Sequence, residues 1–162
     1  MPRVIALVLV LLVGVVACVP VMSQSKSEKV ARELGDLKTR MDEVDRAVLA
    51  IQPQQPVTPE SIRDYARRVA VVIPRYEPIQ EDIEAIQDDA QAVDDDDVVE
   101  AARLLTVMME QRYDGMKEFV SNVASNTFTE EYVTKLQQIN DATNATNAQF
   151  TEIAQRLNER YG

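Results

Sequence analysis

Residues 30–51 read VARELGDLKTRMDEVDRAVLAI, and their apolar side chains recur at alternating spacings of four and three residues. The seven positions are Val30, Leu34, Leu37, Met41, Val44, Val48 and Ile51. Such a repeat places all seven along one side of an α-helix, as in a heptad coiled coil. The pattern therefore predicts an amphipathic helix over residues 29–52.

This apolar seam could be buried in two ways. In a parallel assembly of identical chains, Glu33 would face Lys38 of a neighbour. Arg40 would face Asp45 in the same way, so both flanking pairs would attract. That pattern is compatible with a homo-oligomer through residues 30–51, with the helix as a coiled-coil stalk. Alternatively the helix packs against the rest of its own chain, because single-chain bundles show the same repeat.

Proline marks the boundaries of the next helices. Residues 53–58 contain two prolines and predict a short linker. Thr58 and Pro59 then predict a helix start, since threonine caps a helix and proline is tolerated at its first position. The expected helices cover residues 59–73 and 78–93, on either side of Pro74.

Two long helices of about 29 and 32 residues are expected to follow and to form an antiparallel hairpin. Thr127 and Glu130 have the spacing of a capping box at the start of the second. Four glycines and no tryptophan in 162 residues, without an alternating strand pattern, also favour helices. We therefore predict an all-α fold, an elongated bundle of three to four helices, with residues 59–162 as the bundle domain.

The acidic charge is concentrated in one segment. Residues 76–102 hold eleven carboxylates and neither lysine nor arginine, while the rest of the chain is nearly balanced. A docking face for a basic partner is one interpretation, and a weak divalent-cation site is another. The candidate docking residues are Glu81, Asp82, Asp88, Asp89, Asp94, Asp95, Asp96 and Asp97. The alternative is a solvated helix face on which Asp94 to Asp97 cap the following helix.

Two further clusters are open to more than one interpretation. Arg63, Arg67, Arg68 and Arg75 are expected to pair with acids of the same molecule, in part with the acidic segment. Thr143 and Thr146 fall at core positions of the last helix. The neighbouring polar residues are Asn140, Asn144 and Asn147. This polar layer could line a small ligand pocket or fix the helix register.

The residues that most catalytic sites need are missing. The chain has no histidine and one cysteine, and it lacks a phosphate-binding glycine loop. Its net charge of −10 would repel nucleic acid. We therefore expect a protein that is not an enzyme, with no metal and no non-covalent cofactor.

The single cysteine, Cys18, ends the sequence Val15-Val16-Ala17-Cys18, directly after the apolar run of residues 4–17. This arrangement resembles the lipobox of bacterial lipoprotein precursors, over residues 1–18 only. The resemblance implies that residues 1–17 are a signal peptide and that Cys18 carries a diacylglycerol. Residues 18–28 would then tether the protein to the membrane. Plain secretion after cleavage at Ala17 and an uncleaved anchor are the alternatives.

The resemblance also implies an extracytoplasmic location. Val19 rather than aspartate follows Cys18, which implies the periplasmic face of the outer membrane in a Gram-negative cell. In a Gram-positive cell it implies the outer face of the plasma membrane. We expect a lipid-anchored structural or adaptor component with an envelope protein as partner. A secreted amphipathic-helix lipid-binding protein and a small-ligand-binding bundle are the alternatives.

Overall fold

The computed structural model describes residues 25–52, 54–56, 58–125 and 129–162. The lipobox, Cys18 and the sequence before residue 25 lie outside the described residues. Every element described is helical: α2 Lys26–Leu49, α3 Pro59–Val72, the short 3₁₀ helix η1 Ile73–Tyr76, α4 Glu77–Gln91, α5 Asp96–Ala124 and α6 Glu130–Tyr161. The all-α prediction is therefore confirmed.

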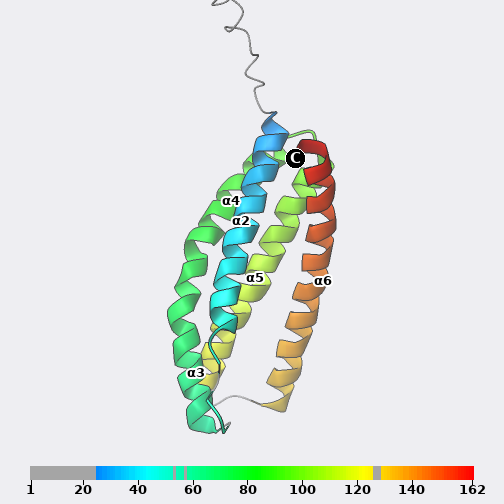
Figure 1. Cartoon of the computed structure of the whole chain (residues 1–162). Coiled ribbons are helices and arrows are strands. Elements are labelled where there is room, and N and C mark those ends of the chain that lie inside the picture. Colours follow the sequence, from blue (N-terminus) through cyan, green and yellow to red (C-terminus); the bar gives the residue numbers. More distant parts are fainter. Residues whose placement is uncertain (1–24, 53, 57, 126–128) are drawn as a thin grey trace, which may run out of the picture.

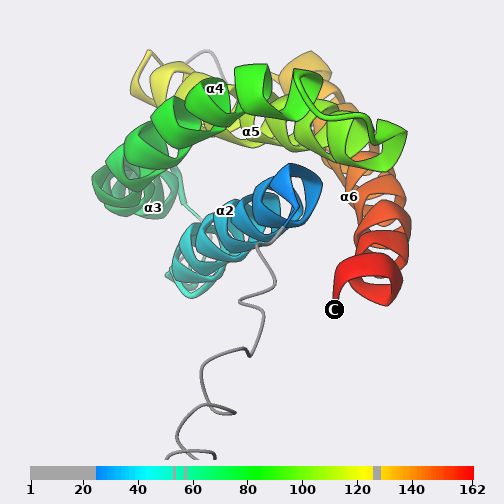
Figure 2. The same cartoon turned by 90° about the horizontal axis from the view of Figure 1, so that it is seen from above.

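The chain passes along the long axis of the bundle four times, in alternating directions (Figure 1). The four passes are α2, the run from α3 through η1 to α4, α5 and α6. α3, η1 and α4 follow one another as an almost continuous rod. Together with α5 and α6 this rod forms a curved layer, and α2 packs on its concave side (Figure 2). The start of α2, the turn between α4 and α5, and the last turn of α6 lie at the same end of the bundle.

The heptad seam of α2 is buried within its own chain. Its residues from Val30 to Val48 are at most 7% exposed, and α2 contacts mainly α4 and α5. Arg40 pairs with Asp82 of α4, and Lys38 pairs with Asp42 one turn along α2. Packing against the same chain therefore accounts for both the apolar seam and its flanking charges. A homo-oligomer through residues 30–51 would have to displace α4 and α5.

The predicted helix boundaries agree with the structure at most ends. Thr58 caps α3 with Pro59 in the first turn, and Ser61 completes a reciprocal capping box. The 29-residue α5 and the 32-residue α6 have the expected lengths. The capping prediction for α6 was wrong, because its N-cap is Thr129, whose hydroxyl accepts a hydrogen bond from the Tyr132 amide at 3.2 Å. Thr127 lies outside the described residues.

α5 lies at the centre of the packing and contacts every other helix. The side chains of Val98, Leu105 and Met108 on α5 are fully buried, among apolar residues of α2, α4 and α6. Burial of these side chains contributes roughly 25 cal/mol per Å² of apolar surface removed from water. Among the described helices, none is long and apolar enough to cross a membrane.

Candidate interaction site

The structure divides the acidic segment into two parts with different roles. In the first part, Asp95 is the N-cap of α5, and its carboxylate accepts hydrogen bonds from the amides of Asp97 and Val98 at 3.0 and 3.4 Å. Such a cap satisfies amide groups that the helix itself cannot. The prediction that the aspartate run caps the next helix is therefore confirmed.

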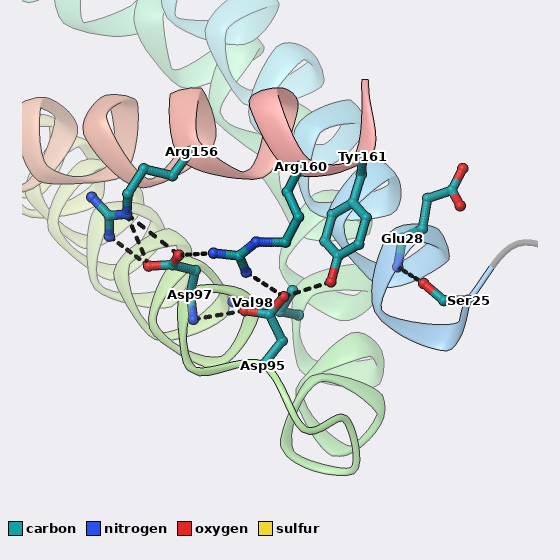
Figure 3. Close-up of polar contacts among 8 residues, drawn as sticks. All are labelled: Ser25, Glu28, Asp95, Asp97, Val98, Arg156, Arg160 and Tyr161. Atoms are coloured by element: carbon teal, nitrogen blue, oxygen red, sulfur yellow. Dashed lines mark hydrogen bonds and ion pairs between the residues drawn. The ribbon is translucent and has the colours of Figure 1, made fainter.

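Side chains from the last two turns of α6 converge on the same carboxylates (Figure 3). Arg160 donates hydrogen bonds to Asp95 at 2.7 Å and to Asp97 at 2.9 Å. Arg156 donates to Asp97 at 2.5 Å, and the Tyr161 hydroxyl donates to Asp95 at 2.6 Å. We call these five residues the terminal clamp, because they fasten the end of α6 to the start of α5.

The terminal clamp shifts the titration of its own groups. Burial alone would raise the pKa of Asp95, but the hydrogen bonds from Tyr161 and Arg160 outweigh it and the pKa is lowered. The hydrogen bond from Arg156 lowers the pKa of Asp97. Both carboxylates are therefore held ionised and occupied, so they have little capacity left for an external partner.

The other six candidate docking residues differ in their surroundings. Asp82 pairs with Arg40 at 2.6 Å, and Asp89 pairs with Lys26 at 3.1 Å. Within the described part of the chain, Glu81 and Asp88 make no ion pair. Asp94 and Asp96 are likewise exposed and without an ion pair there.

A stripe of exposed carboxylates runs along the outer side of α4. Its members, at spacings of four, three and four residues, are Glu77, Glu81, Glu84 and Asp88. We call it the α4 carboxylate stripe. α4 contains no lysine or arginine, and the hydrogen bonds to its members come from uncharged groups, Tyr113 to Glu77 and Gln80 to Glu84. The stripe is thus a negative surface that no lysine or arginine of the described residues neutralises.

Three arginines of the cluster pair with acids of the same molecule, as expected, but none pairs with the acidic segment. The fourth, Arg75, makes no ion pair within the described residues. Arg63 pairs with Glu60, and both Arg67 and Arg68 pair with Asp64, all within α3. The reason is geometric: α3 and α4 lie end to end rather than side by side. Sequence proximity therefore did not bring the two charged groups together.

A buried polar network was missed by the sequence analysis. Asp45 of α2 pairs with Arg112 of α5 and accepts a hydrogen bond from the fully buried hydroxyl of Tyr76 in η1. Burial lowers the pKa of Arg112 and raises that of Tyr76. Asp45 occupies a flanking position of the heptad, where the sequence suggested an exposed inter-chain pair.

A groove separates α2 from α6 at both ends of the bundle. At the end of the bundle opposite the terminal clamp, the groove forms a cavity of about 390 Å³ between Leu49 of α2, Phe119 of α5 and Ile139 of α6, which we call the far cavity. Near the terminal clamp a second cavity of about 370 Å³ lies between Gly35 and Ala154. A Cβ atom added to Gly35 would meet nothing within 4 Å. The two cavities together define what we call the α2–α6 groove.

The polar layer of α6 borders the far cavity. Asn140, Thr143 and Asn144 all line it, and the Thr143 hydroxyl donates to the Ile139 carbonyl at 2.8 Å. Gln111 of α5 also lines it, and its buried Oε1 has no hydrogen-bond partner among the described residues. The predicted polar layer is therefore partly in the core and partly on the groove wall.

The described ranges contain no group of three or more acidic or cysteine side chains placed to hold a metal ion. No protein-family model matches the chain. No curated protein matches it, and no solved structure does either.

Proposed function

We propose that this protein is a lipid-anchored adaptor of the cell envelope that docks a cationic partner on the α4 carboxylate stripe. The observation that carries the proposal is the stripe itself. Like charges at spacings of three and four destabilise a helix by about 0.2–0.5 kcal/mol per pair. A negative row that nothing in α4 neutralises is a cost that a basic partner would relieve.

The anchor would define the orientation of the bundle. Residues 18–24 can span at most about 25 Å between Cys18 and the start of α2. The end of the bundle with the terminal clamp would then lie nearer the membrane, and the 24 residues of α2 extend about 36 Å away from it. The long sides of the bundle, including α4, would face the aqueous space of the envelope.

The anchor is tested by the intact mass of the protein recovered from bacterial membranes, beside a Cys18→Ser variant. We expect a mass raised by diacylglycerol and counted from Cys18, and loss of this increment in the variant. An unmodified chain beginning at Cys18 and free in the medium would contradict the anchor.

Docking is tested with Glu81→Gln, Glu84→Gln and Asp88→Gln combined. Glutamine keeps the helix propensity of glutamate, so α4 should not lose stability. We expect the variant to lose the partner that chemical crosslinking recovers with the native protein from intact envelopes. The matched control changes three exposed acids elsewhere, Glu43→Gln, Glu110→Gln and Asp114→Gln. Equal loss in both variants, or in neither, would remove the specific role of the stripe.

A further inference from the structure

The face of α6 that borders the α2–α6 groove carries no charged residue. Its nine positions, at alternating spacings of four and three, are Val133, Gln137, Asn140, Asn144, Asn147, Thr151, Ala154, Asn158 and Tyr161. Members of this row line the far cavity and the clamp-side cavity alike. We call it the α6 amide face, because five of its nine side chains are carboxamides. In a chain of net charge −10, an uncharged row of this length is a distinct surface.

Two buried acceptors have no hydrogen-bond partner among the described residues, the Oδ1 atom of Asn147 on the amide face and the Oε1 atom of Gln111 on α5. Both atoms are closed to solvent, so a donor from another molecule does not reach them in this conformation. The carboxamides that are open to a partner are the exposed Gln137, Asn140, Asn144 and Asn158. Carboxamides donate and accept, and the complement of one carboxamide is therefore another.

The size of the uncovered surface indicates what would fill the groove. α6 packs chiefly on α5 and touches α2 only sparsely. Leu49 on the α2 side is 77% exposed, and Val133 at the start of the amide face is 48% exposed. A small molecule in the far cavity would contact Leu49 but leave Val133, which does not line that cavity, in water. A helix lying along the groove would cover both sides.

We propose that the occupant is α6 of a second copy, so that two chains form a symmetric dimer through their amide faces. Acidic surfaces of two identical chains repel each other, whereas the uncharged amide face allows close approach. A two-fold axis also makes the interface self-complementary, since α6 both lines one groove and fills the other.

The direction of the two helices rests on the lipid anchor of the proposed function. Two chains anchored in one membrane share the same orientation, so the two-fold axis runs along the bundle and the α6 helices are parallel. Each exposed amide then meets its own counterpart, Asn140 with Asn140 and Asn144 with Asn144. Asparagine pairs of this kind fix register and oligomeric state in parallel coiled coils.

Disulfide trapping tests the dimer, because Cys18→Ser leaves the full chain without a thiol. Into this background we would introduce Asn144→Cys on the amide face or Gln149→Cys as the control. Both sites are exposed, and a separation of five residues places them about 140° apart around α6. Under mild oxidation we expect a covalent dimer from Asn144→Cys and none from Gln149→Cys. Equal trapping at both sites, or trapping at neither, would overturn the proposal.

Two further variants separate the dimer from the anchor and from other occupants. Gln137→Cys and Asn158→Cys should each trap a dimer if the helices are parallel. If Asn144→Cys traps a dimer and these two variants do not, the dimer is supported but its helices are not parallel. That result would contradict the shared orientation that the anchor implies. Asn140→Glu combined with Asn144→Glu should halve the mass measured by sedimentation, while Gln149→Glu should not. If the native protein has the mass of a single chain at about 100 μM, the dimer proposal is overturned and the groove must bind a different partner.

Discussion

Arg160 in the last turn of α6 donates a hydrogen bond to Asp95, the N-cap of α5, at 2.7 Å. The two residues are 65 positions apart in the sequence. Asp95 thus satisfies the amides of one helix and holds the end of another with a side chain that is only 5% exposed. Asp95, one of four consecutive aspartates, therefore connects the start of α5 to the end of α6.

This double role predicts that Asp95→Ala is strongly destabilising. Loss of an N-cap costs about 1 kcal/mol, and loss of the partner of Arg160 and Tyr161 adds to it, for a total of about 2 kcal/mol. Asp96→Ala is the matched control, since Asp96 is exposed and makes no ion pair within the described ranges. Chemical denaturation of the two variants measures the difference. Equal stability would show that the terminal clamp contributes nothing to folding.

The terminal clamp also predicts a loss of stability in acid. The folded pKa of Asp95 and of Asp97 is lowered, so the folded state holds their charged forms more strongly than the unfolded state does. Their contribution is therefore complete above the ordinary aspartate pKa of about 4 and is lost as the pH falls through the lowered values. Unfolding free energies measured between pH 7 and pH 2 should show a decline at the acid end. In Asp95→Asn combined with Asp97→Asn this decline should be smaller.

Because the α2 seam is buried within its own chain, shortening one of its side chains should lower the stability of the single chain. Leu34 is 1% exposed within the main core, and Leu34→Ala should lower the unfolding free energy by about 2–5 kcal/mol. Leu49→Ala is the control, because Leu49 is on the same helix but 77% exposed. Disulfide trapping at residue 144 should not depend on Leu34 provided that the chain still folds. Loss of trapping without loss of stability would instead indicate that the seam contacts a second chain.

The network around Asp45 predicts a coupled effect. Arg112→Leu leaves Asp45 partly buried without its cation, and removing one member of a buried pair costs about 3–5 kcal/mol. Arg112→Leu combined with Asp45→Asn should be less destabilised than Arg112→Leu alone, because the uncompensated charge is gone. A thermodynamic cycle with the single variants measures this coupling. Additive effects would show that the two side chains are independent.

The helices could be predicted because their signals are local. Apolar spacing, prolines and capping residues act within one or two turns, and they gave α3 its start and α5 and α6 their lengths. Thr127 failed as a cap because Thr129, two residues on, has an equally suitable hydroxyl and Thr129 is the N-cap. The distinction depends on backbone conformation in the turn, which residue types alone do not specify.

The sequence identifies the candidate docking residues, but it does not show which of them are already engaged by other side chains of the same chain. Asp94 to Asp97 are chemically identical, yet Asp95 and Asp97 belong to the terminal clamp while Asp94 and Asp96 point to solvent. The difference comes from Arg156 and Arg160, about 60 residues away. Likewise, nothing near Asp45 in the sequence identifies Arg112 or Tyr76 as its partners.

The sequence by itself determined that the chain is helical, where most of its helices begin and end, and which side of each helix is apolar. Those properties follow from interactions between residues within a few positions of each other. Only the tertiary structure decided that the α2 seam is buried inside the chain, which aspartates are occupied and that a groove lies beside an uncharged face of α6. Those outcomes depend on how rods of similar length pack side by side, and one apolar seam can be buried by its own chain or by another.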